Sequence, residues 1–277
     1  MRRLAVLLLA LFLFSPNAPA HAADNPRATL FSPTAEASVP LGEPLLVIGG
    51  AFNGETGGIT DVDVSTDDGA TFTTTDARGE RWALVIVPDT PGPLTISVRA
   101  HTESTVGPYN VTRTIHVGGT TLPPVTSDTT LFLNDVRSPT VKDLDDQPVE
   151  LGLRTTVDRP GSLVGVYLRR GNYTGPVTAR VWSSDGTVLT EQEGPAATVG
   201  QRITFTTPVP VVPGEEYVVS YYTPAGGYLS TEDYFVGNLA QTPFRIPVNA
   251  GVYSYGGGFP TRTWNASSYW IQPVFRP

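Results

Sequence analysis

The sequence consists of short apolar or alternating segments separated by turn residues, and this pattern restricts the fold to strands. Beyond the first residues, no long segment shows the apolar spacing of an amphipathic helix. Glycine and proline contribute 28 and 26 of the 277 residues, and both residues interrupt helices and end strands. The sequence therefore predicts an all-β protein.

The first residues have the pattern of a secretory signal peptide ending at residue 22. Arg2 and Arg3 precede an apolar run over 4–14, and Ala20-His21-Ala22 supplies a small-x-small cleavage pattern. A run of this length is too short to span a bilayer. We therefore expect export, no transmembrane segment after cleavage, and a location outside the cell or on its surface.

Composition excludes several classes of function. The chain has no cysteine, so disulfides and thiol chemistry are impossible. The net charge of −8 becomes −10 without Arg2 and Arg3, which disfavours nucleic-acid binding. His101 and His116 have no zinc-ligand spacing, and a Gly-x-Ser-x-Gly motif is absent. We expect a monomer that is not an enzyme, and we assign no catalytic residue.

A segment with linker composition divides the chain. Residues 118–127 read Gly-Gly-Thr-Thr-Leu-Pro-Pro-Val-Thr-Ser. The predicted domains are an immunoglobulin-like sandwich over 23–119, a linker over 120–127 and a jelly-roll-like β-sandwich over 128–277. We expect the two domains to fold independently. Predicted strands of the first domain cover 45–48, 60–65, 82–87, 94–100 and 109–117. Those of the second cover 149–155, 163–169, 177–182, 188–189, 201–205, 209–212, 216–222, 251–255 and 269–275.

Alternation also predicts which side chains face inward. Within 60–65, Val62 and Val64 are expected inside, and Asp61 and Asp63 outside. The following Ser-Thr-Asp-Asp-Gly-Ala-Thr-Phe segment, 65–72, resembles the Asp-box hairpin of sialidase-like propellers and a hairpin of immunoglobulin-like domains that accompany bacterial enzymes. A propeller needs several copies, and this chain has one. We therefore expect the hairpin to be structural.

Six segments of the second half carry recognisable motifs, namely Val149-Glu150-Leu151-Gly152, Val181-Trp182-Ser183-Ser184-Asp185-Gly186, Phe205-Thr206-Thr207-Pro208-Val209, Tyr217-Val218-Val219-Ser220-Tyr221-Tyr222, Phe259-Pro260-Thr261 and Tyr269-Trp270. Taken together, they resemble a bacterial domain family, domain of unknown function 4082. The resemblance implies an accessory or binding role, because family members end exported, often multidomain proteins, follow immunoglobulin-like domains and often accompany carbohydrate-active modules.

Aromatic residues concentrate near the C-terminus, where six of the twenty residues from 251 to 270 are aromatic. Rings on a loop rich in glycine present a surface for flat or apolar ligands, and sugar rings stack on such surfaces. The alternative is that the rings close one end of the sandwich. We expect Trp182 and Trp270 in the core, Phe259 folded back as a plug, and Trp264 and Tyr255 exposed. The predicted ligand-binding residues are Tyr228, Tyr253, Tyr255, Trp264 and Asn265.

Acidic residues gather before residue 150 and again at Glu232-Asp233. We expect these turns to be solvated and assign no cofactor. The alternative is a structural Ca²⁺, because the side chains of Asp143, Asp145 and Asp146 offer hard oxygen ligands at loop spacing. A glycosidase pair among these carboxylates, Asp143, Asp145, Asp146, Glu150, Glu232 and Asp233, is disfavoured, because a domain of this size without inserted loops is small for a hydrolase.

These observations predict a secreted or cell-surface, non-catalytic accessory protein. Its partner would be an extracellular or cell-wall polysaccharide, bound through the aromatic loop of the C-terminal domain. The alternative is a structural or interaction protein of the cell envelope whose aromatic surface docks a partner domain.

Overall fold

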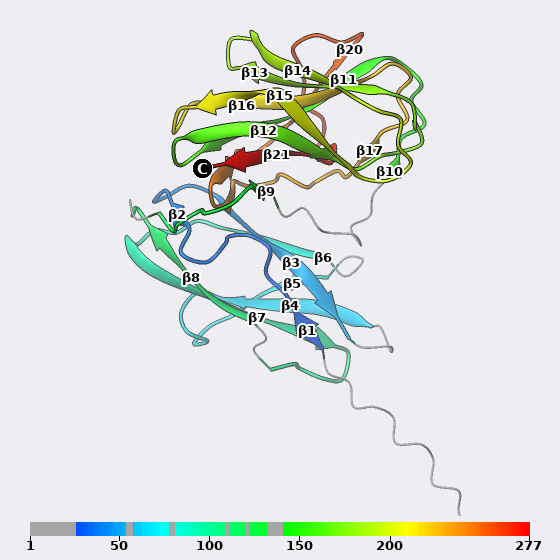
Figure 1. The fold of residues 1–277 in the computed structure, drawn as a ribbon. Helices are drawn as coiled ribbons and strands as arrows, with labels where there is room; N and C mark the ends of the chain where they lie inside the picture. The colour runs from blue at the N-terminus through cyan, green and yellow to red at the C-terminus, as the bar shows by residue number, and fades with distance from the viewer. Residues whose placement is uncertain (1–25, 54–57, 78–80, 109–110, 120–121, 132–140) are drawn as a thin grey trace, which may run out of the picture.

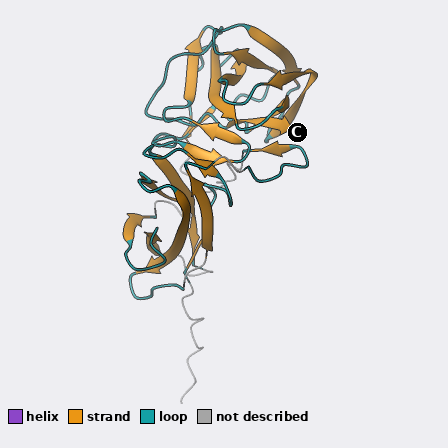
Figure 2. Ribbon diagram, turned by 90° about the vertical axis from the view of Figure 1, so that its left-hand side faces the viewer, coloured by secondary structure: helices purple, strands orange, loops and turns teal. Residues whose placement is uncertain are grey.

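The computed structural model describes residues 26–53, 58–77, 81–108, 111–119, 122–131 and 141–277. Across these ranges all regular structure is strand, so they include no helix able to cross a membrane. Figure 2 shows strands joined by loops and turns, and Figure 1 shows the strands in two groups along the chain. The all-β prediction is confirmed. The predicted signal peptide lies outside the described residues.

The N-terminal group forms an immunoglobulin-like sandwich of two sheets. A three-stranded sheet has the order β1-β3-β6, and a five-stranded sheet has the order β2-β8-β7-β4-β5. Strands β2 and β8 run parallel, whereas the other pairs are antiparallel. The strands are β1 (Arg27–Ala28), β2 (Ser38–Val39), β3 (Leu45–Phe52), β4 (Ile59–Ser65), β5 (Thr73–Asp76), β6 (Arg81–Ile86), β7 (Gly92–Thr102) and β8 (Val111–Val117). This arrangement confirms the predicted fold class of the first domain.

The C-terminal group is a second antiparallel sandwich. One sheet has the order β14-β13-β16-β11-β19-β18, with β20 also paired to β11, and the other has the order β15-β12-β21-β9. A short pair, β10 with β17, lies beside them. The strands are β9 (Thr129–Thr130), β10 (Val141–Lys142), β11 (Val149–Val157), β12 (Gly161–Leu168), β13 (Val177–Ser183), β14 (Val188–Gly194), β15 (Gln201–Val211), β16 (Tyr217–Thr223), β17 (Leu229–Ser230), β18 (Leu239–Gln241), β19 (Phe244–Ile246), β20 (Gly251–Tyr255) and β21 (Ile271–Arg276).

The structure joins two segments that the sequence predicts as separate strands. Residues 201–205 and 209–211 belong to the single strand β15, which includes Pro208 and Pro210. Strand β15 is the edge of its sheet, and an edge tolerates proline because one side needs no ladder hydrogen bonds. A register shift against Leu163 and Gly165 of β12 takes up the irregularity.

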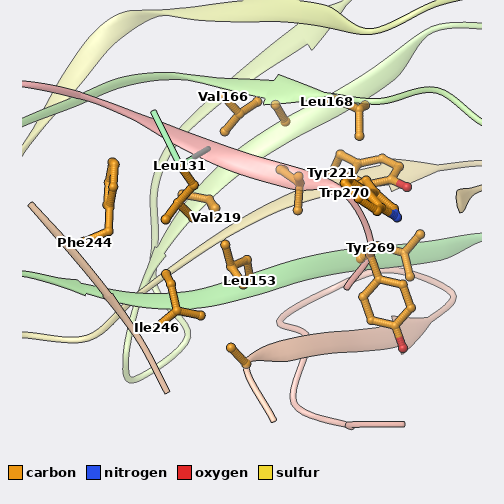
Figure 3. Packing of buried hydrophobic residues seen from close by; sticks show 14 of the residues in the cluster. Leu131, Leu153, Val166, Leu168, Val219, Tyr221, Phe244, Ile246, Tyr269 and Trp270 are labelled. Carbon is orange, nitrogen blue, oxygen red and sulfur yellow. The ribbon is translucent and has the colours of Figure 1, made fainter. Parts of the chain in front are cut away.

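The core of the C-terminal sandwich lies between its two sheets. Figure 3 shows Val166 and Leu168 of β12 facing Leu153 of β11 and Val219 of β16. Trp270 is fully buried beside them, and Trp182 is 6% exposed, on the outer face of the larger sheet. The predicted burial of both tryptophans is confirmed.

Strand β3 is buried on both faces and joins the two sandwiches. Leu45 and Val47 pack in the N-terminal core, whereas Leu46 and Ile48 pack in the C-terminal core. At the same boundary, the N–H of Leu46 donates to the carbonyl of Asn238 over 2.7 Å. Because β3 is buried on both faces, its residues 45–48 are all apolar, whereas a strand of an antiparallel sheet with one exposed face would alternate.

The segment between the sandwiches lies against the C-terminal one. Val125 packs on the C-terminal core, and the guanidinium of Arg159 donates a hydrogen bond to the carbonyl of Pro123. The linker therefore packs, although its composition predicts a free spacer. The boundaries at 119 and 127 stay predictions. Independent folding is also untested, and the core residues that the two sandwiches share argue against it.

Truncation of Leu46 tests whether the two sandwiches unfold together. Leu46→Ala should lower the free energy of unfolding by about 2–5 kcal/mol, because it leaves a cavity in a packed core. Urea unfolding should remain one transition, since a residue of one sandwich contributes to the core of the other. Val85→Ala is the control, because Val85 pairs with Leu46 across β3 and β6 but is 39% exposed. Its cost should be about 0.5 kcal/mol. Two separate transitions, with only the N-terminal one shifted, would contradict this expectation.

Candidate functional site

A pocket of about 370 Å³ opens on the C-terminal sandwich where four segments meet. We call it the aromatic pocket. Its lining residues are Asp143, Tyr228, Ser230, Glu232, Tyr253, Tyr255, Trp264, Ser267 and Tyr269. The structure thus brings together the predicted residues Tyr228, Tyr253, Tyr255 and Trp264, and it places Asn265 next to the pocket.

Backbone pairing ties the walls of the aromatic pocket to one another. Strand β20 pairs with β11, which sets Tyr255 opposite Val149. Strand β10 pairs with β17, which brings residues 141–142 beside 229–230. Reciprocal hydrogen bonds of 2.8 and 3.1 Å join the backbones of Tyr253 and Arg262. The aromatic segment is therefore held by the sheet rather than projecting as a free loop.

Four tyrosine rings form one wall of the aromatic pocket. Neighbouring rings meet edge to face, with centroids 6.0 Å apart for Tyr228 and Tyr269, 6.4 Å for Tyr269 and Tyr253, and 5.6 Å for Tyr253 and Tyr255. This geometry is favoured by the ring quadrupoles. Figure 3 shows the hydroxyl of Tyr269 directed away from the neighbouring Trp270 ring. The wall runs from buried Tyr228 to Tyr255, which is 47% exposed.

Two aspartates orient the hydroxyl groups of this wall. The hydroxyl of Tyr255 donates to Oδ2 of Asp145, and the hydroxyl of Tyr228 bonds to Asp143. Burial and the charge of Asp143 raise the pKa of Tyr228. The hydrogen bond to Asp145 raises the pKa of Tyr255. Both phenols therefore stay protonated and both rings are held in place.

The three aspartates of the predicted calcium site accept hydrogen bonds from neighbouring residues. Oδ1 of Asp143 accepts the N–H of Asp145 over 2.9 Å, Oδ1 of Asp145 accepts the N–H of Gln147 over 2.9 Å, and Oδ1 of Asp146 accepts the side-chain amide of Gln147 over 2.9 Å. Among the described residues no group of three or more Asp, Glu or His side chains is placed to hold a metal ion. Calcium binding at Asp143, Asp145 and Asp146 stays a prediction, and this geometry does not support it.

Glu232 fixes the exposed end of the pocket. Its Oε1 accepts the indole N–H of Trp264 over 2.9 Å, and its Oε2 accepts the side-chain amide of Asn265 over 3.0 Å. The hydrogen bonds from Asn265 and Trp264 lower the pKa of Glu232, so the carboxylate is ionised at neutral pH. The Trp264 ring is 56% exposed and stands beside this charge as a platform.

A tight turn presents Trp264. Asn265 and Ala266 both have positive φ, at 40° and 47°. The N–H of Ser267 donates back to the carbonyl of Trp264 over 2.9 Å, and the N–H of Phe235 donates to the carbonyl of Ala266 over 2.8 Å. Because Phe235 is fully buried, the turn is anchored on the core and the platform has a fixed position.

Three consecutive glycines turn the aromatic segment back onto the sheet. Gly256, Gly257 and Gly258 have φ of 77°, 94° and 87°, a conformation that other residues rarely adopt. Phe259 follows and packs on Trp182, with ring centroids 5.6 Å apart. Phe259 thus folds back as predicted from the sequence, but it is only partly buried, on the outer face of the sheet rather than at one end of the sandwich. We call this ring the plug.

A buried carboxylate supports this plug. Glu150 has no exposed surface. Its Oε2 lies 2.6 Å from Nη1 of Arg180, its Oε1 accepts the hydroxyl of Ser220, and that hydroxyl oxygen accepts the indole N–H of Trp182 over 2.7 Å. Burial raises the pKa of Glu150 to about 7, and the hydrogen bond from Ser220 and the charge of Arg180 oppose the rise. Of the carboxylates considered for a glycosidase pair, Asp143 and Glu232 line the aromatic pocket and Glu150 does not.

The first domain contains the remaining candidates. In the predicted hairpin, Oδ1 of Asp67 accepts the hydroxyl of Ser65 over 2.8 Å and the N–H of Thr71 over 2.9 Å, which is the local turn chemistry expected. Asp63 lies on the face opposite the core residues Val62 and Val64, as the alternation predicts, but it is only 4% exposed. The reason is that Arg99 and His101 lie 2.7 and 2.8 Å from its Oδ2 and cover it on the outer face of the sheet.

Alternation did not predict that Tyr269 would line the pocket. A continuous strand over 269–275 would place one of Tyr269 and Trp270 inside and the other outside. In the structure both are buried, because Trp270 has φ of 58° and the strand begins only at Ile271. Ser230, Ser267 and Glu232 also line the pocket. Of these three residues, only Glu232 could be suspected from the sequence, because it belongs to an acidic pair that follows Tyr228 by a few residues.

Truncation of Phe259 and truncation of Trp264 should have different effects on the free energy of unfolding. Phe259→Ala should lower the free energy of unfolding by about 1–3 kcal/mol, less than a full core aromatic because the ring is only half buried. Trp264→Ala should change it by about 0.5 kcal/mol or less, because the ring is exposed. Denaturant unfolding of the two variants measures both values. Equal costs for the two variants would contradict the assignment of plug and platform.

The raised pKa of Glu150 predicts a pH dependence of stability. Below its ordinary pKa of 4.5, the residue is protonated in both states and its stabilising contribution is complete; the contribution is lost as pH rises through the folded value of about 7. Relative to Glu150→Gln, the native chain should lose about 2–3 kcal/mol of unfolding free energy between about pH 5 and about pH 8. Urea unfolding of both proteins at the two pH values checks this. Parallel pH profiles would show that the carboxyl group does not titrate in this range.

Solved structures resemble this chain only weakly. A biofilm-associated protein BSP domain is 17% identical with a TM-score of 0.25, over 72% of this chain and 26% of that one. This chain therefore spans about a quarter of the length of that protein chain. Fibronectin(III)-like modules of Clostridium thermocellum CbhA are 14% identical with a TM-score of 0.25, over 67% of this chain and 92% of theirs. A SusE-like protein is 11% identical with a TM-score of 0.23, over 82% of this chain and 97% of its own. Likenesses this low carry no argument about function.

The second half of the sequence matches the model of one protein family. No curated protein matches the chain. Residues 136–271 match the family described as Domain of unknown function (DUF4082), and these residues include the aromatic pocket and the plug. The C-terminal half of this chain is therefore a DUF4082 domain, as its sequence motifs indicate.

Proposed function

We propose that the aromatic pocket binds glycan and that the protein is a non-catalytic accessory protein. The observation that carries the proposal is the combination of an exposed Trp264 ring, a wall of tyrosines and the ionised carboxylate of Glu232 around one pocket. The apolar C–H face of a sugar ring stacks on an aromatic face, and its hydroxyls donate to carboxylates. The volume of about 370 Å³ is within the usual range for small-ligand sites.

The charge of the pocket favours glycans without acidic groups. Asp143 and Glu232 are among the lining residues, which include neither lysine nor arginine. An anionic sugar would meet two carboxylates at close range without a compensating cation. The acidic character of the whole chain, with a net charge of −8, acts in the same direction.

The carboxylates favour binding over hydrolysis. A glycosidase requires a general acid whose pKa is raised so that it carries a proton near neutral pH. In the pocket the pKa of Glu232 is lowered by its hydrogen bonds. The carboxyl group with a raised pKa is Glu150, which is buried under the plug and away from the pocket. We therefore propose retention of a saccharide chain rather than its cleavage.

Export and a position outside the cell or on its surface complete this proposal. The support is the signal-peptide pattern of residues 1–22. An extracellular or cell-wall polysaccharide is the partner available to such a protein. The alternative function, docking of a partner domain, is favoured by the exposure of Trp264 and Tyr255. It leaves the hollow shape of the site unexplained.

Affinity electrophoresis of the purified chain tests the proposal. The gels would contain xylan, mixed-linkage β-glucan, galactomannan or pullulan as neutral polysaccharides, and polygalacturonate as an anionic one. We expect retardation by at least one neutral polysaccharide and none by polygalacturonate. Trp264→Ala should weaken the binding by about tenfold or more, as loss of an anchoring aromatic does.

The matched control is Tyr167→Ala. Tyr167 is 37% exposed on β12, in the other sheet, and does not line the pocket. This variant should be retarded like the native chain. Equal retardation of the native and Trp264→Ala proteins would remove the pocket from the proposal. Absence of retardation by every polysaccharide would remove glycan binding.

A further inference from the structure

Glu232 separates the aromatic pocket from a second hollow that lies between the two sandwiches. This hollow, which we call the boundary pocket, has a volume of about 260 Å³. Its lining residues are Thr75, Asp76, Arg81, Trp82, Ala83, Glu232 and Asp233. Because Glu232 lines both pockets, the two hollows are adjacent across one side chain.

The boundary pocket is formed by residues of both sandwiches. Its N-terminal wall comes from β5 and β6, and β6 lies on the side of its sandwich that faces the C-terminal one (Figure 1). Ala83 of β6 packs against the C-terminal core, and the guanidinium of Arg81 lies 4.3 Å from the centre of the Tyr234 ring. These contacts fix the N-terminal wall relative to the aromatic pocket.

The chemistry of the boundary pocket continues that of the aromatic pocket. Asp76 and Asp233 are exposed acceptors at its edge, and Thr75 adds a hydroxyl group. Asp233 is held next to the platform turn, because its N–H donates to the carbonyl of Asn265 over 2.8 Å. Carboxylates therefore line both pockets, Asp143 and Glu232 in the aromatic pocket and Asp76 and Asp233 in the boundary pocket, where Arg81 adds one guanidinium.

We infer that the two pockets form one extended binding site for a saccharide chain. This inference rests on the proposed glycan binding and adds to it the length of the ligand and a role for the N-terminal domain. Sugars stacked at Trp264 occupy the aromatic pocket, and the chain continues past Glu232 so that its hydroxyls reach Asp76 and Asp233. Each pocket alone is small for a ligand site, at or below the lower part of the usual range of about 300–1,000 Å³, whereas a chain that spans both gains contacts from two domains.

Titration calorimetry with oligosaccharides of defined length tests the inference. The probes are the trisaccharide and the hexasaccharide of the xylo-, cello-, manno- and malto- series, used with the full chain. For a series that binds, the hexasaccharide should bind about tenfold more tightly than the trisaccharide, since added contacts worth about 1.4 kcal/mol give this ratio. Asp76→Arg should bring the hexasaccharide to the affinity of the trisaccharide, because the longer side chain enters the boundary pocket. The trisaccharide should bind this variant as it binds the native chain.

Asp89→Arg is the matched control. Asp89 is also an exposed aspartate of the N-terminal domain and does not line either pocket. Its charge change equals that of Asp76→Arg, so an effect of net charge would appear in both variants. Affinity that is independent of chain length, or a length dependence that survives Asp76→Arg, would overturn the extended site and leave glycan binding at Trp264 intact. Failure of all these saccharides to bind would overturn both.

Discussion

The pairing of strand β11 (Val149–Val157) on both edges is the constraint on which the C-terminal half depends. One edge pairs with β16, and the other pairs with β20 and then with β19. Backbone N–H and C=O groups buried in a sheet must be paired, so β11 specifies where these three neighbours lie. Through β20 it also sets Tyr253 and Tyr255 at the rim of the sheet. The aromatic pocket is thus a consequence of how the central strand satisfies its hydrogen bonds.

The relation between the two sandwiches depends on a different strand. In β3, side chains alternate between faces, and each face meets a different hydrophobic core. Ala240 of β18 makes the reverse contact and packs in the N-terminal core. An interface built from core residues of both partners resists relative motion more than the polar contacts usual between domains. This rigidity is what allows residues of β5 and β6 to form one wall of the boundary pocket.

Periodicity in the sequence predicts most of the strands because each is half buried and alternates. It also indicates the double burial of β3, since the run over 45–48 has no polar position. It fails where backbone conformation changes locally. Trp270, with φ of 58°, interrupts the alternation, and Pro208 and Pro210 in an edge strand make β15 resemble two strands. Such features depend on contacts between residues that are distant in sequence. A local pattern of residue types carries no information about those contacts.

The candidate site was partly predictable for a similar reason. Aromatic residues next to glycines indicated where rings would gather, and the residues Tyr228, Tyr253, Tyr255 and Trp264 line one pocket. The roles of the carboxylates were not predictable from residue type. Asp145 orients a phenol, Glu232 holds an indole and is ionised, and Glu150 is buried with a pKa of about 7.

These differences arise from solvation and hydrogen bonding, which the fold decides. A carboxylate near water with two donors is a permanent acceptor, whereas one with no exposed surface is a structural group that resists ionisation. The pocket contains the first kind and the plug covers the second. The fold therefore places charged acceptors where a sugar could reach them. Among the described residues, Glu150 is the one carboxyl group whose pKa is raised, and the fold buries it away from that surface.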